Sequence, residues 1–290
     1  MPPSRERGWA RRVTVFVAFA ALILVAWEGV KLVGGDPWRG DGWLWEPPLD
    51  IWFASDLLLP HVWDIFGALA APVQRGSDAS LAQFLVGAAM YTWREAAIGF
   101  VVGALIGIGL AAAFVHSKLL ERALVPYVIA SQTIPIVALA PMIVFAFGPD
   151  VLSVVIIATY LTFFPVTIAM IRGLRSPDPR ALELMRSYAA SRRSVFWKLR
   201  MPASLPYLFT ALKVSATASI VGAIVGEGPG QIRDGLGRAI INFNNQYISG
   251  PEKLWATILA SAVLGIVFFG FIRLGELLAL RGRGAVPDAA

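Results

Sequence analysis

The feature of this sequence that most constrains its fold is a series of long apolar runs. A helix needs roughly 20 apolar residues to cross about 30 Å of hydrocarbon. Hydrophobic residues make up 57% of the 290 residues and charged residues only 15%, with a mean hydropathy of +0.67. A soluble domain could not shield so much apolar surface from water. The sequence therefore predicts an all-α integral membrane protein with six transmembrane helices, over residues 13–33, 88–115, 124–147, 151–171, 207–226 and 254–274.

The first run allows two interpretations. It follows the basic stretch "RERGWARR", which precedes both cleaved signal sequences and retained membrane spans. Its apolar core is long, and no small-residue cleavage site follows at the right distance. We therefore expect a retained span.

The distribution of charge predicts the orientation of the spans. If six spans alternate from a cytoplasmic N-terminus, the cytoplasmic side holds 18 of the 25 Lys and Arg residues but only 6 of the 19 Asp and Glu residues. Cytoplasmic connections of membrane proteins are enriched in Lys and Arg. Both termini are therefore expected in the cytoplasm, together with the connection 172–206.

Composition also limits the chemistry that the chain can perform. The net charge of +6 is explained by topology and by attraction to an anionic lipid bilayer, so no nucleic-acid partner is implied. The chain has no cysteine, which excludes disulfides and thiolate metal sites. Its two histidines, His61 and His116, fall on opposite sides of the membrane and near no carboxylate cluster. We expect no metal and no cofactor.

Three regions are expected along the chain. Residues 1–87 form the N-terminal span and an extracytoplasmic segment rich in Trp and Pro, whose apolar stretch "DLLLPHVWDIFGALAAPV" is broken by Pro60 and predicts an interfacial helix. Residues 88–274 form the membrane core with a charged connection at 173–206, and residues 275–290 form a cytoplasmic tail.

Small residues recur every fourth position in two of the spans. Gly99, Gly103 and Gly107 lie on one face of the second span, and the fifth span repeats the pattern with Ala and Ser. Such faces let another helix approach closely, because packing and not the hydrophobic effect drives helix association in lipid. The partner is either a helix of the same chain, which we favour, or a second copy of the subunit.

Polar residues within the apolar runs are candidates for a transport pathway. Pro135 and Pro141 predict a kinked third span, and Gln132 and Thr133 beside the kink either line a pathway or bond to a neighbouring helix. Glu227, at the end of the fifth span, is either a solvated helix end or a gate residue.

The connection 172–206 is more elaborate than a simple tether. Pro177 and Pro179 mark a turn, and Asp178 can cap a helix whose first turn holds Glu183. Phe196, Trp197 and Leu199 follow and are expected to pack back against the spans.

This connection resembles the signature of the permease subunits of bacterial ABC importers, which adopt the type I, MetI-like fold. In that signature Glu-Ala-Ala precedes three residues, a glycine, nine residues, an aliphatic residue, one residue and Leu-Pro. The spacing is intact here. Glu183, Leu199 and Pro202 match the signature, whereas Leu184 and Met185 replace the alanines, Ala189 replaces the glycine and Met201 replaces the leucine.

The resemblance implies a coupling helix that docks on a separate ABC ATPase subunit. By matching position, the docking residues would be Glu183, Arg186, Ser187, Ala189, Ala190, Ser191 and Pro202. The chain has no G-x-x-x-x-G-K-[ST] sequence, so it would not bind ATP itself and would not be an enzyme. Further implied partners are an extracytoplasmic solute-binding protein and a second permease copy, in a bacterial inner membrane.

The resemblance extends over about residues 92–226 and favours one group of these permeases. "SQTIPIVALAPMIVFAFG" is similar to the nitrate, sulfonate and taurine permeases, and the Met-Arg-Ser form of the loop with "VGAIVGE" is most similar to permeases for thiamine-precursor pyrimidines and riboflavin. Glu95 stands where many members carry Arg, which argues against a small anion. The expected cargo is a heterocycle, with sulfonate, taurine or nitrate as the alternative.

Two functions of other classes were weighed. A secondary transporter that works without ATP would need paired intramembrane charges or repeated halves, which spans three to six do not show in the sequence. A membrane-embedded enzyme would need a reactive cluster, which the sequence also does not indicate.

Overall fold

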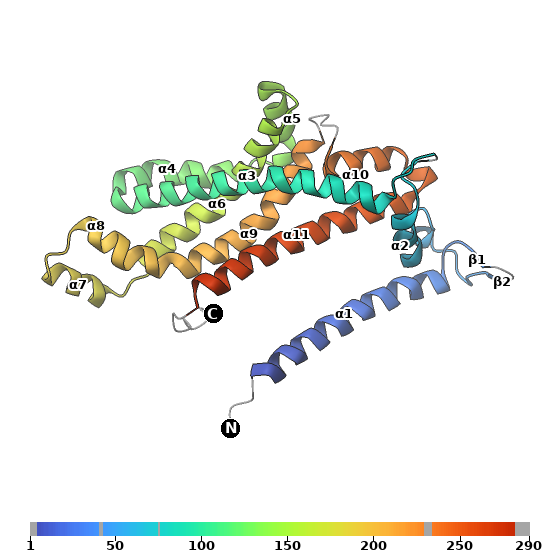
Figure 1. Cartoon of the computed structure of the whole chain (residues 1–290), viewed down its shortest axis with the longest axis horizontal. Coiled ribbons are helices and arrows are strands. Elements are labelled where there is room, and N and C mark those ends of the chain that lie inside the picture. Colours follow the sequence, from blue (N-terminus) through green and yellow to red (C-terminus); the bar gives the residue numbers. More distant parts are fainter. Residues whose placement is uncertain (1–4, 41–42, 75, 229–233, 282–290) are drawn as a thin grey trace. The chain divides into compact units, whose positions relative to one another are not determined.

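The structure is a computed structural model that describes residues 5–40, 43–74, 76–228 and 234–281 (Figure 1). The chain forms two compact units. Unit 1 comprises Met1–Phe84 and Asn242–Ile258, and unit 2 comprises Leu85–Ile241 and Leu259–Ala290.

Helices dominate the described residues, with one short hairpin. In chain order the elements are α1 (Arg5–Val33), β1 (Trp38–Gly40), β2 (Trp43–Trp45), η1 (Trp52–Ala54), α2 (Val62–Ala70), α3 (Leu81–His116), α4 (Lys118–Ser131), α5 (Ile136–Phe147), α6 (Val151–Arg175), α7 (Pro179–Ser187), α8 (Arg192–Val195), η2 (Phe196–Arg200), α9 (Met201–Glu227), α10 (Leu236–Asn245), η3 (Tyr247–Ser249) and α11 (Pro251–Ala279).

Membrane-length helices occur where the sequence predicted them. Helices α1, α3, α6 and α11, and the continuous helix Arg192–Glu227, are each long and apolar enough to cross a bilayer, and α4 with α5 makes a sixth span if the bent pair is counted as one. The all-α, six-span prediction is confirmed.

Within unit 2, helices α3 and α9 both pack on α6. A Cβ added at Gly99 would lie 2.5 Å from the Ala158 Cβ, and one at Gly103 would lie 2.6 Å from the Thr162 Cβ. A Cβ added at Gly107 would likewise lie 2.9 Å from the Val166 Cβ. The glycine face predicted from the sequence therefore lies against α6 of the same chain.

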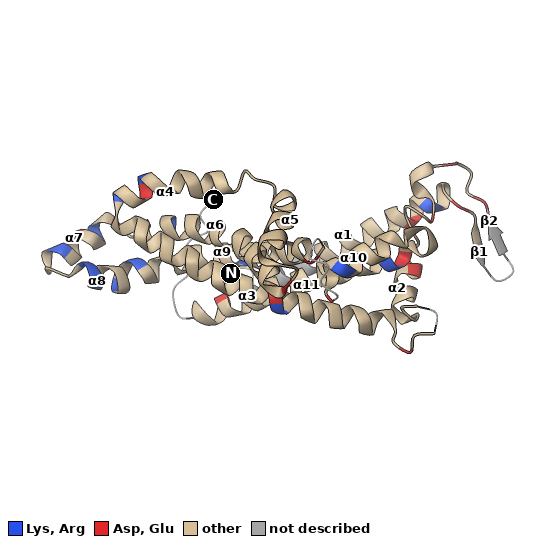
Figure 2. Ribbon diagram, turned by 90° about the horizontal axis from the view of Figure 1, so that it is seen from above, with Lys and Arg blue, Asp and Glu red and all other residues tan. Residues whose placement is uncertain are grey.

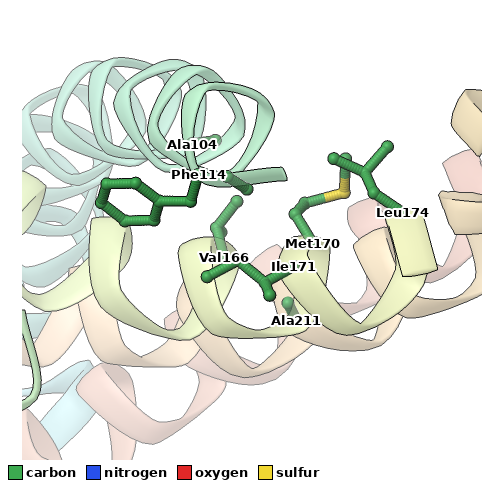
Figure 3. Close-up of a cluster of buried hydrophobic side chains, with 8 residues drawn as sticks. Ala104, Phe114, Val166, Met170, Ile171, Leu174 and Ala211 are labelled. Atoms are coloured by element: carbon green, nitrogen blue, oxygen red, sulfur yellow. The ribbon is translucent and has the colours of Figure 1, made fainter. Parts of the chain in front are cut away.

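The contact between α6 and α9 also depends on small side chains. A Cβ at Gly222 would lie 3.0 Å from the Ala158 Cα, and the Ser215 hydroxyl donates to the Thr162 carbonyl over 3.4 Å. Towards the charged connection, small residues give way to a cluster of larger buried side chains from α3, α6 and α9 (Figure 3). Its members are Ala104, Ala111, Phe114, Val166, Met170, Ile171, Leu174 and Ala211.

Unit 1 is organised around a buried lysine at the end of α1. Lys31 is 1% exposed and forms an ion pair with Asp56 over 2.6 Å. Its ammonium also donates to the carbonyls of Leu59, over 2.7 Å, and of Ala54, over 3.3 Å. An ammonium has three donors, and here each one finds an acceptor, which offsets the cost of burying the charge. The lysine thus fixes η1 and the turns that precede α2.

The tryptophans of unit 1 act as hydrogen-bond donors to backbone carbonyls. The Trp27 indole donates to Pro60 over 3.1 Å, and the indoles of Trp38 and Trp45 donate to the last turn of α1. Residue His61 then links the segment before α2 back to α1 through Glu28, over 2.8 Å, and its Nε2 lies 3.7 Å from Asp56. The expectation that His61 lies near no carboxylate cluster is therefore wrong, because folding brings together residues that are far apart in the sequence. The interfacial helix predicted after Pro60 corresponds to α2.

Candidate functional site

The charged connection folds into a helical hairpin that begins with a capped helix, α7. The Asp178 carboxylate accepts a hydrogen bond from the Arg180 N–H over 2.8 Å, and Pro179 occupies the first turn, where a proline needs no donor. This confirms the predicted cap. The prediction that Glu183 lies in the first turn is wrong, because the first turn carries no acidic residue. Glu183 lies in the second turn and points to solvent as an exposed residue.

A left-handed turn at Ala189 ends α7. Ala189 has a φ of 49°, and it is alone among the described non-glycine residues in having a positive φ. The Ala190 N–H donates to the Met185 carbonyl over 2.9 Å, and the Ala189 N–H donates to the Arg186 carbonyl over 2.9 Å. These two bonds make a Schellman motif, which usually places glycine at this position.

The second arm of the hairpin continues directly into the membrane. The Ser191 hydroxyl caps α8 by accepting from the Ser194 N–H over 3.2 Å. Residues Phe196–Arg200 then form a π-helical turn, after which α9 runs to Glu227. Pro202 lies just after this turn. A proline ring clashes with the carbonyl four residues earlier, and the wider turn relieves that clash.

One aromatic residue anchors the hairpin to the spans. Phe196 packs against the buried cluster of Figure 3 and against the His116 ring, whose centroid is 5.2 Å away. Trp197, which the sequence analysis also placed against the spans, is 59% exposed. That expectation was wrong for Trp197 because successive helical residues point in different directions. Phe196 and Met201 pack against the cluster, and Leu199 is half-buried outside it.

The resulting knob, which we define as residues 178–202, exposes both charge and apolar surface. Tyr188 is 78% exposed and Leu184 is 58% exposed. Basic residues surround them on α7 and α8 (Figure 2). The predicted docking residues Glu183, Arg186, Ser187, Ala189 and Ser191 are exposed, and Ala190 and Pro202 are half-buried. An exposed Tyr beside Arg is typical of protein-binding surfaces.

The third span contains a break rather than the predicted kink. Helices α4 and α5 meet at 99° across residues 132–135. Pro135 caps α5, and the Tyr160 hydroxyl donates to the Ser131 carbonyl at the break. Pro141, in contrast, lies inside α5, which continues past it. The prolines therefore predicted where the third span bends, but the bend is sharper than a kink. The Ser131 carbonyl, which has no helical partner at the break, is instead bonded by Tyr160 of α6.

The candidate pathway residues do not come together as one group. Thr133 and Pro135 are exposed at the break, and the amide nitrogen of Gln132 is buried there without a hydrogen-bond partner in the described part of the chain. Glu227 lies elsewhere in unit 2, with Thr92, Glu95 and Gly237 as its contacts.

Glu227 is fully buried, so the solvated-end interpretation is wrong. Its side chain is 0% exposed, and its Oε2 accepts from the Gly237 N–H over 2.6 Å. Glu95, also 0% exposed, lies beside it. This pairing was not predicted, because the two residues lie far apart in the chain. The available signal was a carboxylate inside a span, which is costly unless it has a role.

Comparison with known proteins identifies a family. Residues 103–276 match the family described as "Binding-protein-dependent transport system inner membrane component". The match covers most of unit 2, including the hairpin and the break between α4 and α5.

Three relatives illustrate the range of this similarity. The formylaminopyrimidine transport permease protein ThiX of Halalkalibacterium halodurans is 36% identical over 64% of this chain and 73% of its own length. The riboflavin transport system permease protein RibX of Chloroflexus aurantiacus is 32% identical, over 57% of this chain and 61% of its own length. The taurine transport system permease protein TauC of Escherichia coli is 26% identical, over 73% and 71%.

Proposed function

The chain belongs to the family of binding-protein-dependent transport system inner membrane components and is an ABC importer permease, and on this basis we propose that it moves a small heterocyclic solute inward. The proposed mechanism is alternating access. ATP binding closes two separate ATPase subunits on each other, and this closure opens the transport pathway outward. ATP hydrolysis then returns the pathway to the inward-facing state. An extracytoplasmic solute-binding protein delivers the cargo.

The observation that carries the mechanism is the knob at residues 178–202. It is a capped hairpin with an exposed Tyr188 at its turn, and it continues through one unbroken helix to Glu227. A force applied to the turn is therefore transmitted along α9 into the membrane. A flexible tether would dissipate that force, because its backbone would bend first.

The assembly proposed around this chain contains two permease copies and two ATPase subunits in a bacterial inner membrane. The Lys and Arg bias supports a cytoplasmic location for the knob and both termini. This orientation supports docking, because the ATPase has access only to the cytoplasmic side.

A charge-reversal variant tests the docking role. Glu183→Lys should abolish ATP-driven uptake and co-purification of the ATPase while leaving membrane insertion unchanged, because the side chain is exposed and makes no contact that the fold needs. Glu46→Lys, an equally drastic change at an exposed residue of unit 1, is the matched control and should leave both unchanged. Normal uptake by Glu183→Lys would exclude the docking role.

The proposed cargo class rests mainly on similarity to ThiX. ThiX, named for a formylaminopyrimidine, is 36% identical to this chain, and RibX, named for riboflavin, is 32% identical. The putative aliphatic sulfonates permease SsuC of Bacillus subtilis follows at 31% and TauC, named for taurine, at 26%. The test is uptake into proteoliposomes that hold this chain, its ATPase and its binding protein. We expect riboflavin or a thiamine-precursor pyrimidine to compete with labelled cargo, whereas competition by taurine, a sulfonate or nitrate alone would overturn the assignment.

A further inference from the structure

A pair of carboxyl groups inside unit 2 has no role in the mechanism above. Glu95 lies within α3, and Glu227 is the last residue of α9, at the end opposite the knob. Both side chains are 0% exposed. The Glu95 carboxyl lies beside that of Glu227, and both of its oxygens are buried.

The hydrogen bonding around the pair is incomplete. Both Glu95 oxygens and the Oε1 of Glu227 lack a donor from elsewhere in the described part of the chain. The Oε2 of Glu227 accepts from the Gly237 N–H, and the Thr92 hydroxyl is a further donor to this carboxylate. Two adjacent carboxylates can share a hydrogen bond only if one of them carries a proton, since an ionised carboxylate is an acceptor alone.

Two glycines hold the site closed around Glu227. A Cβ added at Gly235, whose φ is +107°, would lie 2.5 Å from the Glu227 Cδ. At Gly237 it would lie 2.9 Å from the Glu227 Cβ and would clash with the Ile224 carbonyl. The Leu236 N–H between them donates to the Thr92 hydroxyl over 2.9 Å. These contacts show that the backbone of residues 235–237 lies directly against the Glu227 side chain.

In the described part of the chain, the charges that act on Glu95 do not compensate two carboxylates. Besides Glu227, these charges are Arg94 on α3 and Asp150, the N-cap residue of α6. Arg94 supplies the single positive charge among these groups. Two ionised glutamates would therefore place an uncompensated charge in a buried site, which is strongly unfavourable.

We propose that Glu95 and Glu227 form a proton-binding site, in which one shared proton joins α3 to the end of α9. The proton sits between the two carboxyl groups, and on release it passes to bulk water. While it is bound, the two helices and the start of α10 stay connected through Thr92 and Gly237. Its loss leaves two like charges in contact and separates the helices.

Infrared spectroscopy of the full chain in nanodiscs tests this directly. An ordinary carboxyl group titrates near pH 4, so at neutral pH only an unusual one retains a protonated C=O band. We expect such a band at pH 7, its loss in Glu95→Gln and in Glu227→Gln, and its retention in Glu46→Gln, which alters an exposed residue. A wild-type spectrum without the band, or a band that persists in both site variants, would overturn the proposal.

Thermal unfolding provides a second readout, which does not depend on transport. Because the folded state holds a proton that the unfolded chain releases, stability should fall as the pH rises, by up to about a tenfold change in the unfolding constant per pH unit. Glu95→Gln should abolish this pH dependence of the unfolding constant. Stabilisation by Na⁺ at constant pH, without a protonated band, would instead assign the site to a metal cation and refute the shared proton. Either result leaves the proposed import function untouched.

Discussion

Replacing Ala189 by glycine should stabilise the turn of the knob. The left-handed conformation, with φ at 49°, disfavours a Cβ by about 1–2 kcal/mol. The greater freedom of glycine in the unfolded chain offsets about 0.5–1 kcal/mol of this gain. The net stabilisation of the Schellman turn is therefore about 0.5–1 kcal/mol, which corresponds to a factor of about 2–5 in the opening constant.

Hydrogen exchange in nanodiscs measures this constant at the turn itself. The amides of Ala189 and Ala190 are the donors of the Schellman motif, so peptides covering residues 184–191 report its opening. Ala189→Gly should slow their exchange by the factor given above. Ala190→Gly is the matched control, because residue 190 has no positive φ, and it should accelerate exchange. Faster exchange in Ala189→Gly would refute the assignment of strain to this residue.

Two further predictions concern packing in each unit. Gly103→Val should destabilise unit 2 by about 1–3 kcal/mol, measured by denaturant titration, because the added side chain would overlap Thr162. Gly109→Val, on the same helix, should be nearly neutral because no atom lies within 4 Å of the added Cβ. Equal effects of the two substitutions would refute packing of this face on α6. Lys31→Met should lower the stability of unit 1 by about 1–3 kcal/mol, since it leaves the carbonyls of Ala54 and Leu59 without their donor. Unchanged amide hydrogen exchange at residues 54–62 would count against this network.

Features that depend on local chemistry could be predicted from the sequence. The apolar runs predicted the spans because a bilayer imposes a minimum length on a helix that crosses it. Asp178 before Pro179 predicted the start of α7, because both residues act on the nearest helical turn. The spacing from Glu183 to Pro202 identified the knob. The family signature has a glycine at the position of Ala189, and the structure shows a left-handed backbone there, the conformation that glycine adopts most readily.

Features that depend on distant contacts could not be predicted. Glu95 and Glu227 come together only because α3 and α9 both pack on α6, which no local pattern encodes. The 99° angle between α4 and α5 depends on Tyr160, a residue of another helix. The network around Lys31 likewise joins α1 to residues more than twenty positions away. In each case the partner residue is fixed by tertiary packing.

The central claim is that the turn of the knob binds the ATPase, and single cysteines test it most directly. The natural chain contains no cysteine, so each introduced thiol is a unique site for a short cross-linker. Tyr188→Cys and Ile248→Cys replace residues that are 78% and 89% exposed, the first on the knob and the second in η3 of unit 1. In the assembled transporter, we predict a cross-link to the ATPase from position 188 and none from position 248. An assembled complex without an adduct at position 188, or with equal adducts at both positions, would contradict the account.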